Sequence, residues 1–389
     1  MPCLLQGCGT SDTRAFARQG PETPSPASGK GDSLLASAGG TDEAAQAPRV
    51  DSFADRYAAD SFADRYAAAY GGPKTARGTT GRRTASLPPG SYKVASLSPD
   101  IPYVPAIKQA HTQLIGFENS AFPYSGTNPR TGKATAGRYS DNRVLVHVPA
   151  GFDVRKPGVI VVFFHGHGAT LERDVRDRQL LPAQITESGA NAVLVAPQLA
   201  YDAADSSAGK FYERGGLKRF LAEAADKLGR VYGDPRSTDA FAKMPVVIVA
   251  YSGGFVSAAS SLQVGGAGGR IVGVVLLDAL YGEIDKFSSW IVKNRSGFFV
   301  SAYTHYTKHH DDDLARILRD KGIAVATELS GPLKPGTVAF LPTGEGITHR
   351  DYVTRSWTQH PVKDILVRMQ PRLSSIAARQ EPPLLAQTN

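Results

Sequence analysis

Short apolar runs alternate with amphipathic stretches over the C-terminal three quarters of the chain. The run Val159–Phe164 (VIVVFF) is continuously β-branched or aromatic, which is typical of a strand covered on both faces. Arg143–Val148 alternates like a half-buried strand, and Leu217–Val231 carries apolar residues near helical spacing. Further short apolar runs predict strands at Ala192–Ala196, Val246–Ala250, Ile271–Leu277, Phe298–Ala302 and Val338–Leu341.

Strands that alternate with helices along a chain indicate βαβ units with right-handed crossovers. The sequence therefore predicts an α/β fold with a mostly parallel central sheet and helices on both faces. We expect this fold to occupy residues 96–389 as one domain. A chain of 389 residues is long enough for such a domain and an extension.

The first 95 residues have a different composition. They contain only 11 Val, Ile, Leu, Met, Phe and Trp residues, and long stretches consist of Gly, Pro, Ser, Thr and Ala. So few apolar side chains cannot offset a backbone entropy cost of roughly 1–2 kcal/mol per residue. Residues 1–95 are therefore predicted to be a disordered N-terminal extension or linker.

Composition excludes several classes of protein. No apolar run reaches 18 residues, which excludes a polytopic membrane protein. The net charge of +8 is spread thinly, without a basic block, so we expect no specific nucleic-acid partner. The two cysteines, Cys3 and Cys8, lie close together at the start of the chain, which excludes a disulfide scaffold.

Ser252 lies where a predicted buried strand meets a predicted helix. The strand Val246–Ala250 leads into Tyr251-Ser252-Gly253-Gly254, and the helical stretch Phe255–Leu262 follows. A serine on such a sharp turn, with small residues two positions before and after it, has the arrangement of a nucleophile elbow. Ala250 replaces the usual first glycine but is also small. The alternative is a glycine-rich turn whose serine caps the helix.

Asp278 is the candidate acid. It directly follows the predicted buried strand Ile271–Leu277, so it lies on the same rim of the sheet as the elbow. A solvated turn or a helix cap is the alternative role for this aspartate. Glu283 and the run of Asp311, Asp312 and Asp313 are competing acids, although that run is better explained as charge near the start of a helix.

His349 is the candidate base. It lies in the polar segment Gly346–Asp351, after the last predicted strand and before a final helix. The glycine-rich stretch Thr343–Gly346 gives this loop the freedom to reach the serine.

These residues, in the chain order Ser252, Asp278, His349, resemble the α/β-hydrolase superfamily over roughly residues 140–370. The position of this acid, after the strand that follows the elbow, is similar to its position in lipase-type members. The resemblance implies a serine hydrolase that cleaves an acyl bond, preferably a carboxylic ester, in a small-molecule substrate through an acyl-enzyme. The alternatives are a non-catalytic binding module with this fold and an envelope-associated scaffold protein.

The resemblance also assigns an oxyanion hole. The turn His165-Gly166-His167-Gly168 follows the most hydrophobic strand, where such enzymes provide a backbone N–H for the substrate oxygen. Gly166 or His167 would supply this donor, and Gly253 the second one. His165 and His167 could instead form a metal pair, but no further ligand follows at matching spacing. We therefore expect no metal and no other cofactor.

The N-terminus suggests a membrane tether. Leu4-Leu5-Gln6-Gly7-Cys8 resembles the cleavage box of a bacterial lipoprotein signal, and a long tether would then separate the lipidated Cys8 from the folded domain. Gln6 departs from the usual small residue, and a charged region and an apolar region before the box are missing. The expected location is the cell envelope or periplasm, with the cytoplasm as the alternative.

This hypothesis predicts that the reading frame extends upstream of Met1. The in-frame codons before Met1 should encode a basic start and about ten apolar residues, because a lipoprotein signal needs both. Reading the genomic sequence checks this. Upstream codons without that pattern would leave the cytoplasm as the simpler location.

Overall fold

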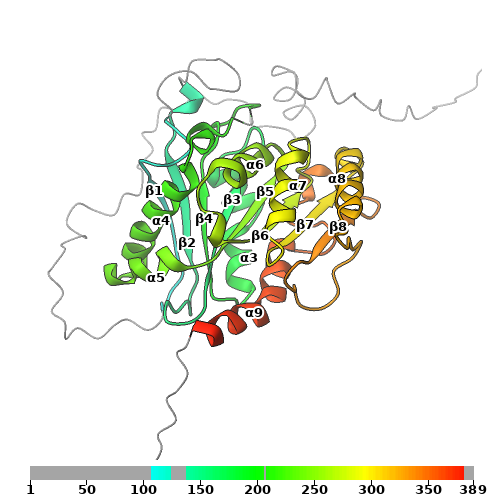
Figure 1. Cartoon of the computed structure of the whole chain (residues 1–389). Coiled ribbons are helices and arrows are strands. Elements are labelled where there is room, and N and C mark those ends of the chain that lie inside the picture. Colours follow the sequence, from blue (N-terminus) through cyan, green and yellow to red (C-terminus); the bar gives the residue numbers. More distant parts are fainter. Residues whose placement is uncertain (1–106, 124–136, 206, 381–389) are drawn as a thin grey trace, which may run out of the picture. The chain divides into compact units, whose positions relative to one another are not determined.

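The computed structural model describes residues 107–123, 137–205 and 207–380, and in these residues eight strands form one sheet (Figure 1). The strand order is β1-β2-β4-β3-β5-β6-β7-β8. β1 pairs antiparallel with β2, β2 pairs antiparallel with β4, and all other neighbours are parallel. The strands are β1 (His111–Gly116), β2 (Arg143–Val148), β3 (Val159–Phe164), β4 (Ala192–Pro197), β5 (Val246–Tyr251), β6 (Ile271–Leu277), β7 (Phe298–Tyr303) and β8 (Val338–Pro342).

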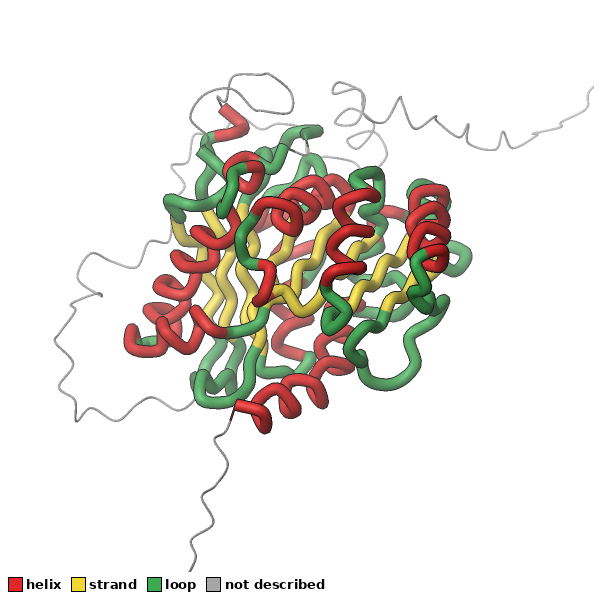
Figure 2. Tube along the Cα trace, in the orientation of Figure 1, coloured by secondary structure: helices red, strands yellow, loops and turns green. Residues whose placement is uncertain are grey.

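Helices cover both faces of this sheet (Figure 2). One face packs against α4 (Gly216–Tyr232), α5 (Thr238–Lys243), α6 (Phe255–Val264), α7 (Ile284–Lys293) and α8 (Lys308–Asp320). The other face packs against α3 (Leu181–Glu187), α9 (Pro361–Gln380) and the π-helix η2 (Leu171–Arg178). Short 3-10 helices complete the chain: η1 (Gly137–Tyr139), η3 (Gly209–Tyr212), η4 (Pro235–Ser237), η5 (Ser252–Gly254), η6 (Gly268–Arg270) and η7 (His349–Asp351).

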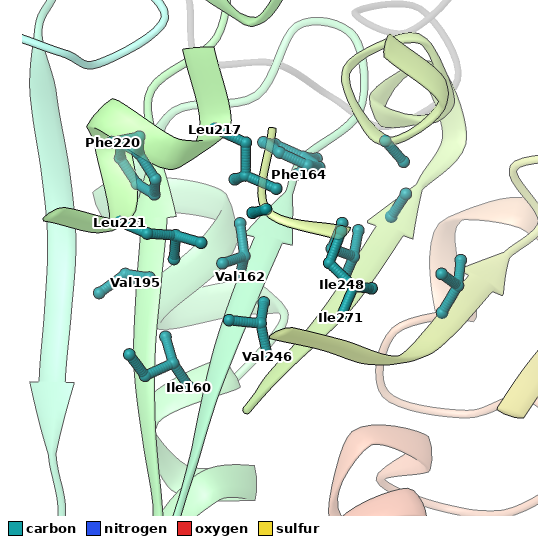
Figure 3. Close-up of a cluster of buried hydrophobic side chains, with 14 of the residues drawn as sticks. Ile160, Val162, Phe164, Val195, Leu217, Phe220, Leu221, Val246, Ile248 and Ile271 are labelled. Carbon is teal, nitrogen blue, oxygen red and sulfur yellow. The ribbon is translucent and has the colours of Figure 1, made fainter. Parts of the chain in front are cut away.

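Strand β3 shows why the central strands are apolar at every position. All six of its side chains are fully buried, because alternate residues face opposite sides of the sheet and both sides are covered. Ile160, Val162 and Phe164 pack with Leu217 and Phe220 of α4, in the core on the face of the sheet that α4 to α8 cover (Figure 3). Val159, Val161 and Phe163 belong to the core on the opposite face, which η2, α3 and α9 cover.

The fold class predicted from the sequence is confirmed: the described residues form an α/β fold, with a mostly parallel sheet between two helical layers. The seven predicted strands and the predicted helices at 217–231 and 255–262 are present, with ends that differ by at most two residues. β1 was missed because its sequence, HTQLIG, is mostly polar and none of its residues is fully buried. It lies at an edge of the sheet, where one side of the strand has no neighbour.

The prediction of a disordered extension over residues 1–95 lies outside the described residues, and so does Cys8. Among the residues that the structure describes, no helix is both long and apolar enough to span a membrane.

The parallel strands place the ends of several loops on one edge of the sheet. β3, β5, β6, β7 and β8 all run in the same direction, so the segments that follow them leave the sheet at the same edge. In open α/β sheets, ligands bind at this carboxyl edge. The candidate residues of the turn at 165–168, the elbow, Asp278 and the loop of His349 all follow these strands.

Gly273 provides a test of this packing. A Cβ at Gly273 of β6 would lie 2.1 Å from two ring carbons of Phe298, which is itself buried. Gly273→Ala should therefore lower the free energy of unfolding by about 1–3 kcal/mol, the usual cost of overpacking a core. Denaturant unfolding measures this value. Gly269→Ala is the matched control, because no atom of the described residues lies within 4 Å of the added Cβ. Equal stability of the two variants would contradict the close packing of β6 against β7.

Candidate active site

Ser252 sits on a strained turn between β5 and α6. Its φ is +53°, in the left-handed region that non-glycine residues rarely adopt. Such strain costs on the order of 1–3 kcal/mol and persists only where the surrounding structure enforces it. The surroundings are tight, since a Cβ at Gly254 would lie 2.2 Å from the Phe164 carbonyl oxygen and a Cβ at Gly166 would lie 2.7 Å from the Ser252 Cβ. The glycines around the turn are therefore needed for the approach of β3 and β5.

A chain of hydrogen bonds joins Ser252, His349 and Asp278. Ser252 Oγ lies 2.9 Å from His349 Nε2, and His349 Nδ1 lies 2.5 Å from Asp278 Oδ2. An ionised carboxylate can only accept, so Nδ1 carries the hydrogen and donates it to Asp278. Nε2 of the neutral ring is then the acceptor for the Ser252 hydroxyl. The three residues come from the ends of β5, β6 and the loop after β8.

Asp278 is completely buried and is held by several donors. Its carboxylate accepts hydrogen bonds from the Thr304 backbone N–H and from the Thr304 hydroxyl, each at 2.9 Å, and from the Thr307 hydroxyl at 3.1 Å. Burial by itself would raise the pKa of Asp278, but the positive charge available on His349 and the hydrogen bonds from His349 and Thr304 outweigh it and hold the pKa below its ordinary value. Asp278 is therefore a carboxylate at neutral pH.

Aromatic side chains fix the position of His349. The Tyr251 ring stacks on the His349 ring with centroids 5.0 Å apart and planes 24° from parallel. The Tyr251 hydroxyl also donates to the His349 backbone carbonyl at 2.9 Å. Tyr281 and Tyr306 pack edge-on against the same ring, with centroid distances of 6.2 Å and 6.3 Å. The imidazole side chain is 20% exposed, so one part of the ring still faces solvent.

His165 holds the glycine-rich turn after β3. The ring is buried, Nδ1 donates to the Gly166 carbonyl at 2.8 Å, and Nε2 accepts from the Leu199 backbone N–H at 2.9 Å. The Gln198 amide lies 2.9 Å from the same Nε2. Burial lowers the pKa of His165, so the ring is neutral. Both ring nitrogens are used within the protein, and no group of three or more potential metal ligands occurs in the described part of the chain.

Two of the residues expected to form an oxyanion hole, Gly166 and Gly253, lie beside Ser252. Gly166 touches the serine, since a Cβ there would lie 3.2 Å from Ser252 Oγ. Gly253 directly follows the serine in η5 and is buried. His167 follows Gly166 on the same turn and is half-buried. The structure thus places backbone from two different turns beside one hydroxyl.

Three of the four competing acids form ion pairs with neighbouring lysines or arginines. Asp312 pairs with Lys308, Asp313 pairs with Arg316, and all four side chains are at least half exposed. Glu283 pairs with Lys286. α8 begins at Lys308 and not after the run, so Asp312 and Asp313 neither cap the helix nor lie in its first turn.

Asp311 does lie in the first turn of α8, but it is not a solvated charge. Its side chain is only 1% exposed and accepts a hydrogen bond from the buried Ser301 hydroxyl. The helix begins at Lys308, three residues before the run, so the first turn of α8 places Asp311 on its inner face toward β7.

Three contributors were missed from the sequence. Thr304 and Thr307 are ordinary polar residues of a strand-to-helix loop, and Tyr251 was noted only as a spacer of the elbow. A signal was present, since two threonines three residues apart follow β7, which neighbours the strand of Asp278. Polar side chains at the carboxyl ends of neighbouring parallel strands often share a site.

Comparisons with known proteins found similar solved structures at low sequence identity. No family model and no curated protein matches the chain. Solved structures that resemble it include the feruloyl esterase module from Clostridium thermocellum complexed with sinapinate, at 15% identity and a TM-score of 0.41, which covers 68% of this chain and 89% of that one. A ferulic acid esterase is 13% identical, with a TM-score of 0.40 and coverage of 69% and 99%. The S-formylglutathione hydrolase from Agrobacterium tumefaciens is 9% identical, with a TM-score of 0.39 and coverage of 69% and 96%. At this similarity, their activities say nothing about the reaction of this chain.

The bond between His349 and Asp278 is directly testable. A short hydrogen bond to a carboxylate should give the His349 Nδ1 proton a strongly downfield NMR resonance. The resonance should disappear in Asp278→Asn, which offers no carboxylate, and remain in Asp313→Asn. Loss of the resonance in Asp313→Asn and its survival in Asp278→Asn would mean that His349 pairs with a different acid.

Proposed function

We propose that this protein is a serine hydrolase that cleaves an acyl bond, preferably a carboxylic ester, through an acyl-enzyme. One observation carries the proposal: the hydrogen-bond chain from the strained Ser252 through His349 to the buried Asp278 carboxylate. A serine hydroxyl is a weak nucleophile until an adjacent base removes its proton, and the base works best when a third group orients it. The three side chains have the arrangement that this chemistry needs.

The first half of the reaction forms the acyl-enzyme. Ser252 Oγ attacks the carbonyl carbon while His349 Nε2 takes the hydroxyl proton, and the carbonyl π electrons move to oxygen. Asp278 stabilises the resulting imidazolium through the Nδ1 hydrogen bond. When the tetrahedral intermediate collapses, the bond to the leaving oxygen breaks, His349 returns the proton to that oxygen, and the alcohol departs.

The second half releases the acid. Water takes the place of the alcohol, His349 removes one of its protons, and the hydroxide oxygen attacks the acyl carbon. Collapse of the second intermediate breaks the bond to Ser252 Oγ, which recovers its proton from His349. The products are a carboxylic acid and the free enzyme, and no metal or cofactor takes part in either half.

Backbone N–H groups would stabilise the negative oxygen of both intermediates. Gly253, at the start of η5, and Gly166 or His167, on the turn after β3, are the proposed donors. Such a donor typically contributes roughly 2.7–4 kcal/mol to the stability of the transition state. The proposal is supported by the contact of Gly166 with Ser252 and by the bonds through which His165 holds that turn.

The aromatic contacts fit the same role. Stacking of Tyr251 on His349 brings a π face to the ring that becomes positively charged in the reaction, and a cation over a tyrosine face gains about 0.5–1 kcal/mol at an exposed site. The hydrogen bond from the Tyr251 hydroxyl to the His349 backbone carbonyl limits movement of the loop that carries His349. A lipid tether at Cys8 remains a separate prediction, and the reaction does not depend on it.

Ser252→Ala tests the nucleophile. The variant should lose p-nitrophenyl ester hydrolysis by about 10⁴-fold or more, because no other group replaces the missing oxygen. It should also fail to react with a fluorophosphonate probe, and its melting temperature should not fall. Ser257→Ala is the matched control on α6, since Ser257 Oγ is buried without a hydrogen-bond partner in the described residues.

Activity of Ser252→Ala within tenfold of wild type, a barrier change of only about 1.4 kcal/mol, would rule out Ser252 as the nucleophile. A wild-type protein that neither hydrolyses esters nor reacts with the probe would favour a non-catalytic binding module.

A further inference from the structure

A second buried carboxyl group lies behind Asp278. Asp311, in the first turn of α8, is 1% exposed, and the buried Ser301 hydroxyl of β7 donates to its Oδ1. Its Oδ2 is buried and has no hydrogen-bond partner among the described residues. The reaction proposed above does not use Asp311. A carboxyl group in such a place is costly to keep ionised, because burial removes it from water and no lysine or arginine of the described residues forms an ion pair with it.

Thr307 connects the two carboxyl groups. This N-terminal flanking residue of α8 is completely buried, and its hydroxyl donates to Asp278 Oδ1 at 3.1 Å. The Asp311 backbone N–H donates to the Thr307 carbonyl at 3.1 Å, and the Thr307 hydroxyl acts to lower the pKa of the Asp311 carboxyl. A hydroxyl has one hydrogen to donate, so Thr307 can serve as donor to only one of the two at a time.

The charges around Asp311 favour its neutral form. Burial and the nearby negative charges of Asp278 and Asp312 raise the pKa of Asp311 to about 8, although Ser301 and Thr307 act in the opposite direction. Asp278 makes the larger of these two charge contributions, and its own pKa is held low. The two carboxyl groups therefore differ at neutral pH: Asp278 is ionised and Asp311 carries a proton.

The other titratable groups around Asp311 do not change this assignment. Tyr303 of β7 and Tyr352 after η7 interact with Asp311, and burial raises the pKa of both phenols, so they stay neutral. Lys308 is exposed and paired with Asp312. The charged residues of α7 that meet α8, Asp285 and Lys293, line an open groove of about 710 Å³ together with Asp313, Arg316 and Lys321.

We propose that Asp311 is a positioning residue, whose neutral carboxyl leaves the Thr307 hydrogen to Asp278 and so keeps Asp278 aligned with His349. The anion of Asp311 would compete for that hydrogen and would add a second negative charge behind Asp278. This inference rests on the proposed hydrolase function for its kinetic consequence. Its structural part, the neutral acid at position 311, is independent of activity.

The kinetic test is the pH profile of kcat. Wild-type kcat should fall about tenfold as Asp311 ionises above pH 8, the size expected for a weakened hydrogen bond to a charged group, while KM stays unchanged. Asp311→Asn cannot ionise, so its profile should lack this alkaline fall and keep most of the activity at pH 7. Asp311→Leu should lower kcat at every pH. Asp313→Asn, the same change at an exposed position, should leave the wild-type profile unaltered.

A stability test does not require activity. In the unfolded chain an aspartate ionises near its ordinary pKa of about 3.9, so between about pH 4 and 8 the folded protein holds one proton more than the unfolded chain. This group therefore makes folding less favourable as the pH rises through that window. The melting temperature of Asp311→Asn relative to wild type should accordingly rise from pH 4 to pH 8 and then level off. Asp313→Asn should show no such trend.

The His349 Nδ1 proton reports on alignment without catalysis. Its downfield resonance should shift with a midpoint near pH 8 in the wild type and should not shift there in Asp311→Asn. A melting-temperature difference that is independent of pH, or a resonance with the same alkaline shift in both proteins, would overturn the role of Asp311. An inactive wild type in which both pH effects appear would instead overturn the proposed function and support the neutral Asp311.

Discussion

The buried negative charge of Asp278 is the constraint on which the site depends. A carboxylate without exposure to water is unstable unless donors surround it, and here they come from His349, from Thr304 and from Thr307. These residues follow β7 and β8, which lie in order beside the strand of Asp278. The order of the last three strands, and their parallel direction, is therefore what makes an ionised Asp278 possible at this edge of the sheet.

The sequence was sufficient for the fold because the central strands are buried on both faces. Runs such as Val159–Phe164 have no polar position, and only a covered parallel sheet accommodates several of them in a chain with intervening helices. β1 escaped prediction for the converse reason. Its HTQLIG sequence has no apolar period of two, and only the pairing with β2 makes it a strand. Local hydrophobicity does not predict that a segment pairs with another one far away in the sequence.

The positions of Ser252, Asp278 and His349 were predictable because each follows a strand whose end the sequence marks clearly. The contributions of Thr304, Thr307 and Asp311 were not, because they depend on how β6 and β7 are aligned and on where α8 begins. A start at Lys308 places Asp311 in the first turn with its side chain buried, whereas a start after the run would place it outside the helix. A shift of a few residues in a helix boundary therefore changes a surface charge into a buried acid, and propensity alone does not fix boundaries that closely.

The site also shows how one sheet edge can hold two aspartates in different states. Asp278 accepts hydrogen bonds from three donors of Thr304 and Thr307 and from the imidazole of His349, so its charge is the favourable form. Asp311 has one donor hydroxyl, a second oxygen without a partner, and Asp278 as a negative neighbour, so its favourable form is the acid. Environments that separate the pKa values of two neighbouring carboxyl groups allow them to serve different purposes. Here the first would orient the base, and the second would keep the first in place without adding a charge that the buried site could not stabilise.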